Sequence, residues 1–234
     1  MRDNLPGLAI GTIATGKERD MKLFIGICNS QENIPSSFFW SVARMTHICP
    51  TIMDRGTHPW DVIRNNQLID NFLKTDCDYF VKMDVDQVYP YDYFAAMVPL
   101  LATHDIIGPM IFDRHNTFDF MPLCFETDKD EPLAKRGKPF DNKTGIMELP
   151  YLHTNCFYNR YALEAIPKPW YEAHATPDGL ARANHVDYTF MSKFTAAGFK
   201  IYINFDMVVP HLAQVAVTRE FHEIYNAGKA ALND

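Results

Sequence analysis

Apolar residues come in short runs along the chain, and each run passes into polar residues that indicate a loop. Two such runs, at 22–28 and 79–83, have the length and composition of buried strands. Between them, apolar residues after Thr57 recur at helical spacing, which predicts a helix with Thr57 as its N-cap. The same patterns predict helices at 36–45, 91–101, 186–197 and 218–232, and strands at 48–53, 105–111, 146–152, 199–203 and 208–211.

This alternation of strands and helices predicts an α/β fold with a mostly parallel central sheet flanked by helices. A length of 234 residues is enough for one core of this kind and favours a single domain over 1–234. Within it, 1–20 is expected to be an N-terminal extension, and 113–145, rich in charge, proline and glycine, a long flexible loop. Ligands of such sheets bind at the carboxyl ends of the strands, so we expect the site there.

Composition narrows the possible classes of function. A formal net charge of −7 argues against a protein that coats DNA or an anionic membrane. The N-terminus lacks the pattern of a signal peptide, and no integral membrane segment is expected because no apolar stretch is long enough. The cysteines form no Cys-x-x-Cys pair, which predicts reduced thiols and a cytoplasmic protein; they are Cys28, Cys49, Cys77, Cys124 and Cys156.

The strongest chemical feature is the Asp-x-Asp pair of Asp84 and Asp86, which directly follows the apolar run at 79–83. Alternate side chains of an extended segment point the same way, and two neighbouring carboxylates favour a hard cation such as Mg²⁺ or Mn²⁺. An EF-hand loop beginning at Asp84 is excluded, because Tyr89 and Ala95 stand where it needs glycine and glutamate. Two alternatives stay open: a strand-end turn with a helix-capping aspartate, and a haloacid-dehalogenase-like phosphotransferase with Asp84 as nucleophile.

Several segments, taken in order, resemble the GT-A glycosyltransferases, in particular compact bacterial and phage-type members similar to glycosyltransferase family 2. The resemblance extends over most of 22–211. Its parts are the opening strand and loop at 22–30, the pair Arg64 and Asn65, the aspartate segment at 78–86, the segment 152–156, the helix start at 185–190 followed by Gly198, and the late strand ending at His211.

The resemblance implies a GT-A (Rossmann-like) fold and transfer of a sugar from a nucleoside diphosphate, a UDP-sugar being favoured, to a hydroxyl acceptor. The acceptor stays open among glycans, proteins and modified nucleic acids. The implied cofactor is Mn²⁺ or Mg²⁺, with Asp86 and His211 as ligands and Asp84 in contact with the metal or the ribose. A non-catalytic nucleotide-sugar-binding relative is an alternative, because Val186 stands where the family usually has an acid.

The resemblance also gives roles to residues around the aspartate pair. Asp187 is the candidate general base, and in that role it implies inversion of the anomeric centre; the alternative is an aspartate that favours the helix dipole. Independently of the resemblance, Trp170 and Tyr171 are candidates for stacking on a sugar, because aromatic faces suit its C–H surfaces; packing in the core is the commoner role of such residues. The other expected donor contacts are Asn29, Arg64 and Asn65 at the nucleotide, and His153 and Asn155 near the sugar.

Overall fold

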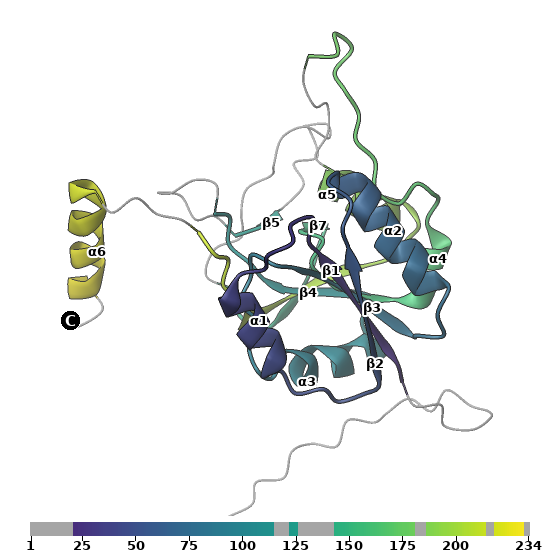
Figure 1. The fold of residues 1–234 in the computed structure, drawn as a ribbon, viewed down its shortest axis with the longest axis horizontal. Coiled ribbons are helices and arrows are strands. Elements are labelled where there is room, and N and C mark those ends of the chain that lie inside the picture. The colour runs from purple at the N-terminus through teal and green to yellow at the C-terminus, as the bar shows by residue number, and fades with distance from the viewer. Residues whose placement is uncertain (1–20, 115–121, 126–142, 181–185, 214–217, 232–234) are drawn as a thin grey trace, which may run out of the picture.

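The computed structural model describes residues 21–114, 122–125, 143–180, 186–213 and 218–231. The expected extension at 1–20 and most of the expected loop at 113–145 lie outside this part of the chain. A seven-stranded sheet with the order β2-β1-β3-β8-β4-β9-β6 forms the centre of the fold (Figure 1). Its strands are β1 (Leu23–Cys28), β2 (Thr51–Gly56), β3 (Tyr79–Asp84), β4 (Ile106–Met110), β6 (Ile146–Leu149), β8 (Phe157–Asn159) and β9 (Ile201–Val208).

The direction of the strands confirms the predicted mostly parallel sheet. β1 pairs in parallel with both β2 and β3, and β4 pairs in parallel with β9. β8 lies antiparallel between β3 and β4, and β6 lies antiparallel to β9 at the edge. The strands β1, β2, β3, β4 and β9 therefore run in one direction, and their carboxyl ends meet at one edge of the sheet.

Helices cover both faces of this sheet (Figure 1). Along β1, Leu23 and Ile25 pack into one buried cluster, while the alternate residue Phe24 packs into the other, as the two-residue repeat of a strand requires. One face carries α2 (Asp61–Leu73), α4 (Arg160–Ala165) and α5 (Val186–Ala196); the other carries α1 (Ser36–Ala43), α3 (Tyr93–Met97) and the 3₁₀ helix η1 (Val98–Ala102). A last helix, α6 (Arg219–Ala231), lies apart from the sheet.

Several predicted elements differ in detail from the structure. Thr57 does not cap α2, which begins at Asp61 with Trp60 in the N-cap position. The helix expected at 91–101 becomes α3 and η1, with Pro99 in the first turn of the 3₁₀ helix. The segment expected as one strand at 146–152 divides into β6 and β7 (Tyr151–Leu152), and β7 pairs with β5 (Cys124–Phe125), a strand inside the region predicted to be loop.

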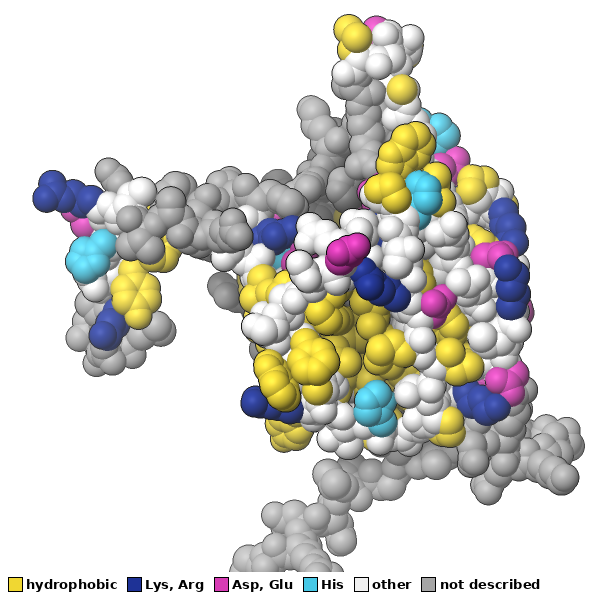
Figure 2. Space-filling view, viewed as in Figure 1, with side chains coloured by type: hydrophobic (Ala, Val, Ile, Leu, Met, Phe, Trp, Pro, Cys, Tyr) yellow, Lys and Arg dark blue, Asp and Glu magenta, His cyan; other side chains and the backbone are white. Residues whose placement is uncertain are grey.

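Other features of the described residues bear on the class of protein. All five cysteines are free, and four of them are buried. Within the described part of the chain, every helix is too short or too polar to cross a bilayer. Figure 2 shows hydrophobic side chains gathered on the face around α1, where Phe39 and Trp40 are exposed.

Candidate functional site

Two adjoining cavities lie where the carboxyl ends of β1 and β3 meet the N-terminus of α5. The larger has a volume of about 1030 Å³ and the smaller about 210 Å³. They share Asp84, Asp86, Arg114 and Asp187 in their walls. We call them the large cavity and the small cavity. The fold thus brings together residues from β3, from the loop after β4 and from α5, including three of the predicted acidic residues.

Asp86 and His211 are held together by the backbone on either side of them. The amide of Leu212 donates to the carbonyl of Asp86 at 2.7 Å, and the amide of Val88 donates to the carbonyl of Pro210 at 2.9 Å. As a result, His211 Nε2 lies 3.5 Å from Asp86 Oδ2. His211 Nδ1 lies 2.9 Å from the carbonyl oxygen of Phe112. Because a carbonyl only accepts, Nδ1 carries a proton and Nε2 is the nitrogen that faces the carboxylate.

The charges around Asp86 reinforce one another. Arg114 Nη2 lies 2.7 Å from Asp86 Oδ2. Burial acts to raise the pKa of Asp86, but the hydrogen bond from His211 and the charge of Arg114 lower it overall. Burial acts to lower the pKa of His211, but its bonds to Asp86 and Phe112 raise it overall. Asp86 is therefore an ionised carboxylate that lies between the guanidinium of Arg114 and the imidazole of His211.

Asp84 has a different partner, the buried side chain of Lys82. Lys82 Nζ lies 2.9 Å from both carboxylate oxygens of Asp84 and 2.5 Å from Asn155 Oδ1. Burial acts to lower the pKa of Lys82, but Asp84, followed by Cys28 and Asp187, raises it overall. Lys82 is therefore a charged ammonium in the lining of the large cavity, and its two hydrogen bonds fix the position of the Asp84 carboxylate.

Substituting Lys82 with methionine is expected to lower the free energy of unfolding by about 1–3 kcal/mol, because Asp84 and Asn155 both lose the donor that they share. Urea unfolding followed by circular dichroism measures this change. The double substitution Lys82→Met with Asp84→Asn removes the unpaired charge and is the matched control. We expect it to recover part of the loss; an unchanged stability in Lys82→Met would show that the ion pair contributes nothing.

Asp187 lies in the first turn of α5 and lines both cavities. The hydroxyl of Thr154 donates to Asp187 Oδ1 at 3.1 Å. This bond fixes one carboxylate oxygen and comes from a neutral group. The carboxylate therefore sits at the junction of the two cavities, where it can act on a ligand that occupies both.

Three hydrogen-bond donors at the large cavity have no partner among the described residues. They are Asn29 Nδ2, Arg64 Nε and Arg114 Nε, and all three atoms are buried. Each of these residues lines the large cavity. Asn29 Oδ1 accepts a hydrogen bond from the amide of Gln31 at 2.9 Å, which orients the side chain and leaves its NH₂ group without a partner. Buried donors without partners are costly, and all three belong to residues that line this one cavity.

The other predicted donor-site residues lie at different distances from the cavities. Asn65 lines the large cavity, and its Oδ1 accepts a bond from Cys28 Sγ at 2.8 Å. Asn155 and His153 line the small cavity. Both ring nitrogens of His153 are engaged, Nε2 with the Pro109 carbonyl at 2.8 Å and Nδ1 with the Asn155 amide at 3.2 Å. His153 therefore shapes the wall of the small cavity and has no free nitrogen for a sugar.

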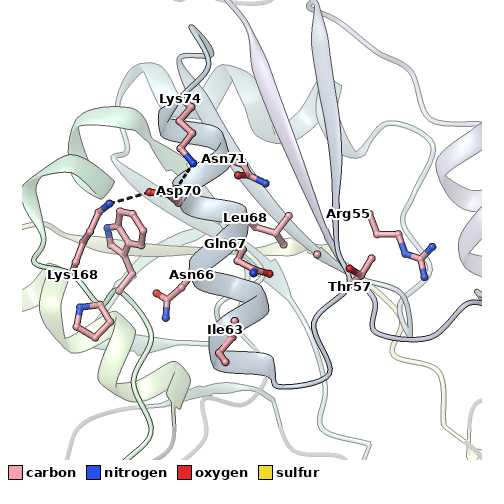
Figure 3. A pocket seen from close by; sticks show the side chains of 13 residues that line it. Arg55, Thr57, Ile63, Asn66, Gln67, Leu68, Asp70, Asn71, Lys74 and Lys168 are labelled. Carbon is pink, nitrogen blue, oxygen red and sulfur yellow. Dashed lines mark hydrogen bonds and ion pairs between the residues drawn. The ribbon is translucent and has the colours of Figure 1, made fainter.

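The structure places Trp170 away from both cavities. Its side chain is only 4% exposed, and its Nε1 donates to the carbonyl of Leu163 at 3.1 Å. It borders a separate hollow on the outer side of α2, where Lys168 and Lys74 both pair with Asp70 (Figure 3). Lys168 covers the indole, with its Nζ 4.5 Å from the ring centroid. Packing in the core, and not sugar stacking, is the role that this geometry gives Trp170.

Two site residues, Lys82 and Arg114, are absent from the predictions made from sequence. The sequence signal for Lys82 was its position in a run otherwise typical of a buried strand, because a lysine there needs an anionic partner. Its partner Asn155 is 73 positions away. Arg114 follows β4 at the start of the region predicted to be flexible, so nothing near it in sequence indicated contact with Asp86.

Comparisons with known proteins bear on the fold of the chain. No protein-family model matches the sequence, and no curated protein matches it. Among solved structures, the chain is similar to A197 from STIV, with a TM-score of 0.54 and 14% identity over 85% of this chain and 97% of that chain. GalNAc-T7 has a TM-score of 0.54 and 12% identity, over 85% of this chain and 45% of its own. S. aureus TarS has a TM-score of 0.51 and 11% identity, over 87% of this chain and 38% of its own.

These similarities define the class of fold. The order of strands, the antiparallel β8 within a mostly parallel sheet and the helices on both faces form a GT-A-like glycosyltransferase fold. The expectation for the fold is therefore confirmed. The chain spans less than half the length of GalNAc-T7 and of TarS, so the likeness concerns the part of those proteins that has this fold.

Proposed function

We propose that this protein is a glycosyltransferase that moves a sugar from a nucleoside diphosphate to a hydroxyl acceptor. The observation that carries the proposal is the lining of the large cavity by Asn29, Arg64 and Arg114, each of which has a buried donor atom without a partner among the described residues. A diphosphate offers many acceptor oxygens and a negative charge to the guanidinium groups of Arg64 and Arg114. The NH₂ group of Asn29 can donate to a carbonyl of the base. The large cavity would therefore hold the nucleotide, and the small cavity the sugar.

The nature of the donor is supported by a protein with the same fold. The structure of GalNAc-T7 contains UDP, GalNAc and Mn²⁺. A UDP-sugar is accordingly the donor that we propose first for this chain. The phosphotransferase alternative is not pursued, because the fold is that of glycosyltransferases and both oxygens of Asp84 are bound by Lys82.

The residues around Asp86 fit a divalent cation. An ionised carboxylate oxygen and an imidazole nitrogen face each other, and the Nδ1–H bond to a carbonyl is the arrangement that orients a metal-binding histidine. No group of three potential metal-binding side chains occurs among the described residues, so diphosphate oxygens and water would complete the coordination. Asp86 and His211 would hold Mn²⁺ or Mg²⁺, which would neutralise the charge that develops on the departing diphosphate.

The protein's own residues have distinct proposed tasks. Both carboxylate oxygens of Asp84 already accept hydrogen bonds from Lys82. Asp84 would therefore contact the ribose or a metal-bound water, and Asp86 would be the direct ligand of the metal. Arg114 would leave Asp86 for the diphosphate as the donor and metal bind. Asp187 would accept the proton of the acceptor hydroxyl as that oxygen attacks the anomeric carbon. A single displacement of this kind inverts the anomeric centre.

A donor-panel assay tests the proposal directly. Purified protein with Mn²⁺ is incubated with UDP-, GDP-, CDP- and dTDP-sugars, with and without pooled glycan and protein acceptors, and release of the nucleoside diphosphate is measured. We expect release from one class of donor, stimulated by Mn²⁺ and suppressed by chelation. Nucleotide binding without release from any donor would favour a non-catalytic relative, and absence of both would overturn the proposal.

A further inference from the structure

The small cavity has an acidic lining. Four carboxylates border it, from Asp84, Asp86, Asp113 and Asp187. The rest of its lining includes the neutral polar residues Gln87, Thr154 and Asn155 and the hydrophobic residues Ile111, Leu123 and Tyr151. Carboxylates only accept hydrogen bonds, so a ligand that forms a hydrogen bond with one of them must bring donors. A sugar with several hydroxyl groups meets this need.

Each cation near the small cavity already has a carboxylate partner. Arg114 is the one lysine or arginine among the described residues in its lining, and it pairs with Asp86. Lys82 reaches Asp84 from the large cavity. His211 also faces Asp86, while burial lowers the pKa of His153 to about 4 and so keeps that ring neutral near pH 7. When a donor binds, Arg114 is proposed to pair with the diphosphate in place of Asp86, so an incoming carboxylate would have to compete with Asp84, Asp86 or the diphosphate for a cation, or lie unpaired beside Asp187.

We propose that the small cavity selects an uncharged sugar and rejects a uronic acid, so that the donor is a nucleoside diphosphate linked to a neutral sugar. This inference rests on the proposed function and goes further, since it concerns the sugar and not the nucleotide. The small cavity has about a fifth of the volume of the large one, so every substituent of a bound sugar lies close to the lining. Like charges at short range in a half-enclosed space repel strongly, and discrimination of this kind acts by excluding the wrong ligand.

Pairs of nucleotide sugars that differ only at carbon 6 isolate the effect of charge. In each pair the uronic acid has a carboxylate where the neutral sugar has CH₂OH. The pairs are UDP-glucose with UDP-glucuronic acid, UDP-galactose with UDP-galacturonic acid, and UDP-N-acetylglucosamine with its uronic acid. Isothermal titration calorimetry with Mn²⁺ gives the affinity of each, with UDP alone as reference. GDP-mannose and GDP-mannuronic acid serve as the pair if the protein binds GDP and not UDP.

For the pair that contains the tightest-binding neutral sugar, we expect the uronic acid to bind at least about tenfold more weakly. Asp187→Asn removes one carboxylate from the lining without a change in size, and we expect it to narrow this ratio. Asp76→Asn, an exposed carboxylate at the other end of β3, is the matched control and should leave the ratio unchanged.

The outcomes separate this inference from the proposed function. A uronic acid that binds as tightly as its neutral partner, while the nucleoside diphosphate itself binds, overturns the selection of an uncharged sugar and leaves the glycosyltransferase proposal intact. Failure of every nucleoside diphosphate to bind in the presence of Mn²⁺ overturns both. Discrimination that persists unchanged in Asp187→Asn would contradict the electrostatic origin proposed here.

Discussion

Substituting Asp86 with alanine is expected to abolish the effect of Mn²⁺ on nucleotide binding. In the wild-type protein Mn²⁺ should tighten binding of the nucleoside diphosphate, because the cation joins the phosphates to Asp86 and His211. Without the carboxylate, one of two protein ligands is lost, and the ratio of the dissociation constants without and with Mn²⁺ should fall to about one. Calorimetric titrations of UDP with and without Mn²⁺ measure this ratio.

Three further variants make this experiment specific. His211→Ala removes the other proposed ligand and should have the same effect as Asp86→Ala. Asp84→Asn should weaken nucleotide binding but keep the response to Mn²⁺, since Lys82 already occupies both oxygens of Asp84. Asp76→Ala, whose side chain is 57% exposed and pairs with Lys22, is the control for loss of a carboxylate elsewhere. Equal nucleotide affinity with and without Mn²⁺ in the wild-type protein would refute the metal bridge.

The contrast between Asp84 and Asp86 is a result of tertiary structure that the sequence alone could not supply. The sequence places two carboxylates side by side after a strand and predicts a shared cation. In the folded chain each has a different protein cation, Lys82 for Asp84 and Arg114 for Asp86. Only the pair of Asp86 and Arg114 joins segments that are distant in sequence, because Arg114 comes from the loop after β4. Lys82 and Asp84 are alternate residues of β3, and the distant contribution to that pair is Asn155, which accepts a hydrogen bond from Lys82.

The general fold was predictable because its signals are local. β1 is uniformly buried, and β3 is apolar apart from Lys82 and Asp84. Gly198, with a φ of 86°, follows α5 as the pattern of a helix end predicts. β8 was not predicted, because its three residues, Phe157–Asn159, are too few to give a periodic signal. Its pairing with β3 also joins positions far apart in sequence, since Asn159 pairs with Tyr79, 80 positions earlier. The antiparallel insertion that marks this fold is therefore the part that sequence patterns could not give.

Burial decided the cases in which a residue type had two plausible roles. The indole of Trp170 is suited to stacking on a sugar, but its ring lies in the core and its Nε1 donates a hydrogen bond to the carbonyl of Leu163. His153 lies beside the small cavity, yet its two nitrogens hold the backbone at Pro109 and Asn155. Neither outcome is visible in sequence, because both depend on the packing of segments that are far apart along the chain.

Substituting Asp187 with asparagine is expected to lower kcat by about 10²–10⁴-fold while leaving nucleotide affinity nearly unchanged. Asparagine keeps the shape of the side chain and can still accept the hydrogen bond from Thr154, but it cannot accept a proton from the acceptor hydroxyl. Thr154→Val removes only the orienting bond and should cause a smaller loss. Steady-state turnover on the donor and acceptor identified by the panel measures both effects, and circular dichroism checks the fold.

The anomeric configuration of the product tests the same role independently, because a base that activates the acceptor for direct attack requires inversion. Proton NMR of the first-formed product distinguishes the two anomers by their coupling constants. Inversion together with a large loss of kcat in Asp187→Asn would establish the carboxylate at the junction of the two cavities as the base. Retention, or full turnover in Asp187→Asn, would instead leave Asp187 as a group that binds the sugar, with its effect confined to donor affinity and to the preference for an uncharged sugar.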